Sequence, residues 1–265
     1  MACSASCQCS GARGQKSILY SILRTDDQPT QRSLGRQRFD IPPERACSCG
    51  SNKTAVLRAP LVTSKATSAV LFKTLRFVKN VPCFRQLPAK DQLQLVRNSW
   101  APLLVLGMAQ DALDFETVET SEPSMLQKIL TNCQNKQEIS TGHNGQGVSL
   151  VDVQGIKMFL SKCWGLNIST KEYAYLKGVI LFNPDIAELQ SQRYILSLQL
   201  EAHKALHEYV KMIYQGDSVR FAKLYIAISM LQSINAQIVA RLFFGSVIGK
   251  ASIDDLLLEM FYYQK

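Results

Sequence analysis

The stretch LRFVKNVPCFRQLPAKDQLQLVRNSW, residues 75–100, decides the fold. It joins two helical patterns at Pro82, which cannot continue a helix and therefore ends the first of them. The first pattern is an apolar stripe at helical spacing, made of Val70, Leu71, Leu75 and Val78. The second pattern, residues 91–110, is apolar nearly all round, which predicts a helix buried in the middle of the domain. Because such a helix needs neighbours on both sides, we expect three layers of helices.

Downstream of this stretch the helical spacing continues. Three further apolar stripes are Ile156, Phe159, Leu160 and Cys163; Ile195, Leu198, Ala202, Leu206, Tyr209 and Ile213; and Phe221, Leu224, Ile228 and Leu231. A short helix is expected over 171–181, and a last one near Ser252, which is a candidate N-cap. Residues 134–147 are polar and contain three glycines, which predicts a loop. The domain is therefore predicted to be all-α.

Residues 1–62 differ in composition and are expected to form a mostly disordered arm in front of a folded domain at 63–265. They are rich in Ser, Gly, Gln, Arg and Pro and show little periodic hydrophobicity. Residues 1–60 carry nine Lys and Arg against four acidic residues, in a chain of net charge +9. Such an arm could bind RNA or act as a scaffold through phosphate contacts. A solvated, flexible arm without that role is the alternative.

Several classes of protein are disfavoured by the sequence. No apolar stretch reaches the roughly 18 to 20 residues of a membrane span, and no signal peptide begins the chain, so we expect no membrane contact. The eight cysteines include Cys-x-Cys pairs without zinc-knuckle spacing, and we interpret them as free thiols. His203 and His207 share a helix face, yet surface histidines are favoured over a metal site. With no catalytic motif present, we expect no enzyme, no metal and no cofactor.

Residues 75–100 resemble the signature of nuclear receptor ligand-binding domains. In that signature a helix ends in an aromatic-x-Lys element, and an apolar turn and an Asp-Gln-x-x-Leu helix follow. The matching residues are Phe77, Lys79, Phe84, Leu87, Asp91, Gln92, Leu95 and Val96. The resemblance extends over 68–262 and is greatest to the group B orphan receptors without a DNA-binding domain, of the adrenal hypoplasia type and related to the small heterodimer partner type. It implies a three-layer helical sandwich of the ligand-binding-domain type.

The resemblance also implies a groove that binds a short Leu-x-x-Leu-Leu helix. Such a helix has unpaired N–H groups at one end and unpaired C=O groups at the other. A Lys at the C=O end and a Glu at the N–H end would clamp it. The implied groove residues are Lys79, Leu93, Val96, Leu256, Leu257, Glu259, Met260 and Phe261. The alternative is an ordinary helix-end cation at Lys79 and a solvated carboxylate at Glu259.

Three segments carry apolar residues of the kind such grooves accept. Two show the i, i+3, i+4 spacing of helix-in-groove anchors, and the third lies between two prolines. They are Leu19, Tyr20, Ile22 and Leu23; Leu126, Ile129 and Leu130; and Pro82, Cys83, Phe84, Leu87 and Pro88. For the second segment core packing is an equal alternative. For the third, Phe84 and Leu87 could equally fill the turn between two helices.

The expected function is that of a transcriptional corepressor acting through protein contacts. By resemblance, the partners are receptors of the steroidogenic-factor type and the liver-homologue type, estrogen receptors, and corepressors. We expect competition with coactivators, no sequence-specific DNA binding, a homodimer or heterodimer as one possibility, and a location in nucleus and cytoplasm. The alternatives are a receptor regulated by a ligand in its own pocket and an RNA-binding or scaffold protein.

Overall fold

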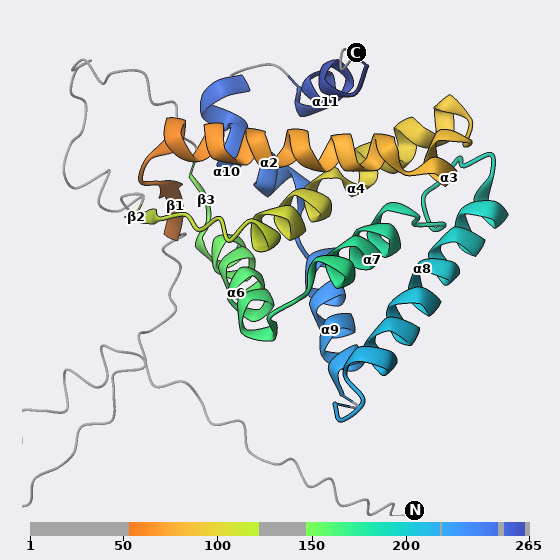
Figure 1. The fold of residues 1–265 in the computed structure, drawn as a ribbon. Coiled ribbons are helices and arrows are strands. Elements are labelled where there is room, and N and C mark those ends of the chain that lie inside the picture. The colour runs from red at the N-terminus through yellow and green to blue at the C-terminus, as the bar shows by residue number, and fades with distance from the viewer. Residues whose placement is uncertain (1–52, 122–146, 218, 249–251, 263–265) are drawn as a thin grey trace, which may run out of the picture. The chain divides into compact units, whose positions relative to one another are not determined.

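The computed structural model describes residues 53–121, 147–217, 219–248 and 252–262. Figure 1 shows their arrangement. The helices are α2 (Pro60–Asn80), α3 (Pro82–Arg85), α4 (Ala89–Gln110), α6 (Leu150–Leu166), α7 (Thr170–Leu181), α8 (Gln192–Ile213), α9 (Arg220–Gln232), α10 (Ala236–Ile248) and α11 (Ile253–Tyr262). The strands are β1 (Lys53–Leu57), β2 (Thr117–Ser121) and β3 (Val148–Ser149). The predicted arm up to residue 52 and the segment 122–146, with most of the predicted loop, lie outside the described residues.

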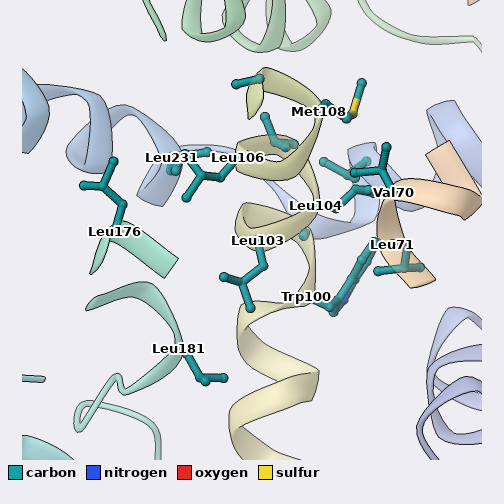
Figure 2. Packing of buried hydrophobic residues seen from close by; sticks show 14 of the residues in the cluster. Val70, Leu71, Trp100, Leu103, Leu104, Leu106, Met108, Leu176, Leu181 and Leu231 are labelled. Carbon is teal, nitrogen blue, oxygen red and sulfur yellow. The ribbon is translucent and has the colours of Figure 1, made fainter. Parts of the chain in front are cut away.

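Helix α4 is the centre of the domain. It packs against α2 and α10 on one side and against α6, α7 and α9 on the other (Figure 1). In Figure 2, Trp100 and Leu104 extend toward α2, whereas Leu106 extends toward Leu231 of α9. Leu104 is completely buried, and Leu106 is 2% exposed. The predicted central helix with neighbours on both sides is therefore confirmed, and so is the three-layer helical architecture.

The contact between α2 and α4 depends on a glycine. A Cβ atom built on Gly107 would lie 2.9 Å from Thr74 Oγ1 and 2.9 Å from Val70 Cγ1, which is closer than real Cβ contacts. The predicted stripe of α2 faces this contact, because Val70 and Leu71 are buried. The missing side chain at residue 107 thus allows the two helices to approach closely.

A small sheet adds to the helices at one end of the domain. Its strand order is β2-β1-β3, and both pairs are antiparallel. β1 pairs with β2 from Lys53 opposite Ser121 to Leu57 opposite Thr117. Both β1 and the start of α2 precede residue 63, the boundary expected from composition. The short strands were missed because five residues or fewer carry little alternation.

A buried ion pair joins α7 to α9; we call Glu172 and Arg220 the ion-pair cluster. Glu172 is fully buried, and its two carboxylate oxygens accept hydrogen bonds from Arg220 at 2.7 and 2.8 Å. Arg220 also donates to the carbonyl oxygens of Leu166 at 3.1 Å and Asn167 at 3.3 Å. Glu172 completes a capping box with Ser169 at the start of α7. These bonds give a protein partner to both carboxylate oxygens of Glu172 and to all three guanidinium nitrogens of Arg220.

Helices α9 and α10 form the C-terminal part of the core. Leu224, Ile228 and Leu231 of the predicted stripe in α9 are buried, and Phe221 is half-buried. The sequence did not separate α10, although Asn235 accepts a hydrogen bond from the Gln237 N–H at its start. Among the described residues no single helix is long and apolar enough to cross a membrane. Taken together, α9 and α10 have the length and composition of such a helix, but they are bent by 68° at the break between them.

Candidate coregulator groove

Lys79 lies in the last turn of α2 and is half-buried. Its ammonium group donates a hydrogen bond to the backbone carbonyl of Phe261, with Nζ 2.5 Å from the oxygen. The same Nζ lies 5.2 Å from the centre of the Phe261 ring, within the range of a cation–π contact. Phe261 lies in the last turn of α11. Lys79 therefore binds the carbonyl end of an amphipathic helix.

Two signature residues at the start of α4 tie this helix to its neighbours. The Gln92 side chain donates to the carbonyl of Leu87 at 2.8 Å and that of Arg85 at 3.4 Å, which ties α3 to α4. The Asp91 carboxylate is buried and accepts from the backbone N–H groups of Gln190 and Ser191, each at 2.8 Å. These two N–H groups lie just before α8, so Asp91 holds the beginning of that helix.

The predicted floor of the groove is partly covered. Leu93 is half-buried, whereas Val96 is 2% exposed and belongs to the core. Both lie on α4, one turn apart, on the helix that Gln92 ties to α3. Of the two predicted floor residues, Leu93 is therefore the more accessible to solvent.

The segment Pro82 to Pro88 turns the chain from α2 into α4. Pro82 and Pro88 are exposed at its two ends, but Phe84 is 1% exposed and Leu87 is 4% exposed. Burial raises the pKa of the half-buried Cys83 thiol, which keeps it protonated at neutral pH. The two apolar residues of the predicted docking segment therefore point into the domain in this arrangement.

Helix α11 carries the spacing of a docking motif. Leu257, Met260 and Phe261 stand at positions i, i+3 and i+4, which places them on one face. Leu257 is 1% and Phe261 is 6% exposed, while Met260 and Leu256 are half-buried. The Ser252 hydroxyl accepts from the Asp254 N–H at 3.2 Å, so the predicted N-cap is confirmed. α11 thus presents to Lys79 the kind of helix that the groove was predicted to bind.

Phe261 also contacts the turn segment. Its ring meets the Phe84 ring edge to face, with the ring centres 6.2 Å apart and the planes at 87°. We call Lys79, Phe84 and Phe261 the Phe261 junction. No sequence signal linked Phe84 to Phe261, because they are far apart in the chain and their contact depends on how α11 docks.

Glu259, the second predicted clamp residue, is exposed on α11. It precedes Phe261 by two residues, which is about 3 Å along the helix axis. Since Lys79 binds the carbonyl of Phe261, Lys79 and Glu259 lie toward the same end of α11. A clamp requires the two charges at opposite ends of a docked helix. α11 would have to move before Glu259 could take that place.

The sequence also singled out two histidines and two further docking segments. His203 stacks on Tyr225 with ring centres 5.1 Å apart, and His207 meets the edge of Phe221 at 4.8 Å. These ring contacts explain why the two histidines face α9, and no cluster of metal-ligating side chains occurs among the residues described. The docking segments 19–23 and 126–130 lie outside the described residues.

Comparison with known proteins identifies the family of the chain. Residues 63–248 match the family model described as the ligand-binding domain of nuclear hormone receptor. The chain is similar to proteins named nuclear receptor subfamily 0 group B member 1. It is 50% identical over 264 residues to that of Callithrix jacchus and 46% identical over 260 residues to that of Homo sapiens, each match covering 93% of this chain and 55% of the relative. The Mus musculus protein is 43% identical over 80% of this chain and 48% of its own length.

The chain therefore spans about half the length of the curated relatives it matches. The family model covers well over half of this chain. It ends where α10 ends. The chain belongs to the nuclear hormone receptor family, and residues 63–248 are its ligand-binding domain.

Proposed function

We propose that this protein represses transcription in the nucleus by docking onto other nuclear receptors and recruiting corepressors through the groove at Lys79. One observation carries the proposal: Lys79 Nζ lies 2.5 Å from the backbone carbonyl oxygen of Phe261, in the last turn of a helix with i, i+3, i+4 apolar anchors. That contact is the chemistry by which a groove recognises a short amphipathic helix. The similarity to the group B receptors supports the repressor role.

Docking onto receptors is assigned to the predicted motifs. Leu19, Ile22 and Leu23 would enter the partner's groove, and so would Leu126–Leu130 or the Pro82–Pro88 segment. Residues 17–24 are too short to hold a helix alone, since nucleation is costly below about 12 to 15 residues. Each buried anchor would contribute on the order of 1.5 to 3 kcal/mol gross, and ordering would take back roughly 2 to 5 kcal/mol. A weak contact results, which several motifs on one chain would strengthen.

The test is a binding panel with the purified full chain. Receptor domains of the steroidogenic-factor type, the liver-homologue type and the estrogen receptor are immobilised, and the dissociation constant is measured by surface plasmon resonance. We expect Leu19→Ala combined with Leu23→Ala to weaken docking at least tenfold, because two anchors are truncated. Tyr20→Ala is the matched control, since position i+1 points away from the anchor face.

Corepressor recruitment is measured separately in the same preparation. Lys79→Glu should abolish binding of a corepressor peptide, because it places a negative charge against the carbonyl end of the helix. It should leave receptor docking through residues 19–23 unchanged. Full-strength docking by the double alanine variant and by matched variants at Phe84 and at Leu126 and Leu130 would contradict the proposal.

A further inference from the structure

Phe261 contacts two residues, Lys79 and Phe84, to which the proposed function assigns two different binding roles. Its carbonyl oxygen accepts from Lys79, the residue expected to receive a corepressor helix. Its ring packs edge to face on Phe84, the residue expected to enter a partner receptor. Phe84 and Phe261 are both almost entirely buried, at 1% and 6% exposure. Each ring therefore forms part of the surface that buries the other.

In the present arrangement, the contacts with Phe261 prevent both Phe84 and Lys79 from binding a partner. Phe84 cannot be buried in a partner's groove while it is buried inside its own domain, so docking through Pro82–Pro88 must break its contact with Phe261. Lys79 cannot bind the end of an incoming helix while it binds the carbonyl of Phe261. α11 also carries the anchors Leu257, Met260 and Phe261, and it therefore competes with any peptide of that pattern.

We propose that insertion of the Pro82–Pro88 segment into a partner receptor releases α11 and thereby opens the Lys79 groove, so that receptor docking and corepressor binding strengthen each other. This inference rests on the proposed function and adds its regulation. The ligand admitted at Lys79 is an amphipathic helix with i, i+3, i+4 apolar anchors and a carbonyl end next to the ammonium group. Because the coupling is a free energy shared by two sites, each partner raises the affinity for the other by the same factor.

The first experiment needs no partner. Hydrogen–deuterium exchange of residues 253–262 is measured by mass spectrometry in the full chain and in Phe84→Ala. The lost aromatic contact should accelerate exchange in α11 roughly 2- to 12-fold. Arg85→Ala is the matched control, because Arg85 is exposed on the same short helix and its exchange pattern should equal that of the parent. Lys79→Met leaves α3 intact and should also accelerate exchange in α11.

The second experiment adds a saturating receptor domain to the full chain. The expected result is slower exchange at residues 82–88 together with faster exchange at 253–262. Slower exchange at 82–88 with unchanged exchange at 253–262 overturns the coupling but leaves the docking proposal standing. A complex without slower exchange at 82–88 overturns both the coupling and docking through this segment. Unchanged exchange of α11 in both Phe84→Ala and Lys79→Met overturns the coupling whatever the partner does.

Discussion

The ion-pair cluster and the Phe261 junction both hold one helix of the domain against its neighbours, but they differ in what it costs to open them. At the ion-pair cluster, Arg220 has 9% and Glu172 has 0% of its side chain exposed. At the junction, Lys79 is half-buried and can return its ammonium group to water. A charge left unpaired in the interior is expensive, whereas an exposed charge is not. The α7–α9 contact is therefore costly to open, and the α11 contact is suited to two states.

The largest effect is expected when the ion-pair cluster is broken. Arg220→Met leaves the buried Glu172 carboxylate without its cation and should lower the free energy of unfolding by about 3 to 5 kcal/mol. The quantity is measured by urea denaturation followed by circular dichroism. Replacing Glu172 by Leu as well should restore part of the loss, because no uncompensated charge remains. Equal stability of the single variant and the parent would contradict the assigned role. Lys223→Met, which removes an exposed pair with Asp217 at 3.4 Å, should cost less than about 1 kcal/mol.

A somewhat smaller loss is expected at Asp91. Asp91→Ala removes a charged acceptor from the N–H groups of Gln190 and Ser191 and should cost about 1.5 to 3 kcal/mol in the same assay. Asp91→Asn keeps one acceptor oxygen, and we expect it to lose about half as much. If both variants unfolded like the parent, the start of α8 would be held by other contacts.

Acid should weaken the ion-pair cluster in a defined direction. Burial by itself raises the pKa of Glu172, but the hydrogen bonds from Arg220 and Ser169 outweigh it, so the pKa lies below its ordinary value of 4.5. A carboxyl with a lowered pKa stabilises the folded state above its unfolded-state pKa and loses this contribution as the pH falls through its folded-state pKa. The stability difference between the parent and Arg220→Met should therefore shrink below pH 4.5. A constant difference down to the acid transition would contradict this assignment.

The smallest effect on global unfolding is expected at the junction. Phe261→Ala should lower the free energy of unfolding by less than about 1 kcal/mol, because α11 can detach before the core unfolds. Phe244→Ala is the contrast: this ring is 1% exposed against Trp100 in the core, and its loss should cost about 3 to 5 kcal/mol. If the two variants were equally unstable, α11 would be part of the cooperative core, and the difference between the two regions would disappear.

The sequence predicted the helices that bury a continuous stripe or a whole surface. The α4 helix is the clearest example, since its all-round apolar surface required the layered neighbours that Figure 1 shows. β1 was not predicted, because its pairing with β2 joins segments more than 50 residues apart and five residues carry little local signal. α10 was not separated from the pattern of α9, since both are apolar and only Asn235 marks the start of the second.

Parts of the candidate site could be predicted, and parts depended on tertiary contacts. Lys79 was found from the aromatic-x-Lys element and lies in the last turn of α2, while its role as a clamp stays a prediction. The burial of Phe84 and its contact with Phe261 depend on how α11 docks, which no spacing within either segment encodes. The docking roles of Leu19–Leu23, Leu126–Leu130 and Pro82–Pro88 remain predictions for the binding panel.

The bond between Asp91 and the start of α8 has a consequence for folding kinetics. It joins residues 99 and 100 positions apart, so a loop of that length must close before the bond can form. α4 and α8 can each form locally in about a microsecond, whereas the bond between them also requires this long loop to close. The entropy of closing a loop grows only with the logarithm of its length, about 0.6 kcal/mol for each doubling. Residues 122–146 lie inside this loop, and lengthening them should therefore lower the folding rate only slightly. A substitution at Asp91 should raise the unfolding rate by a much larger factor.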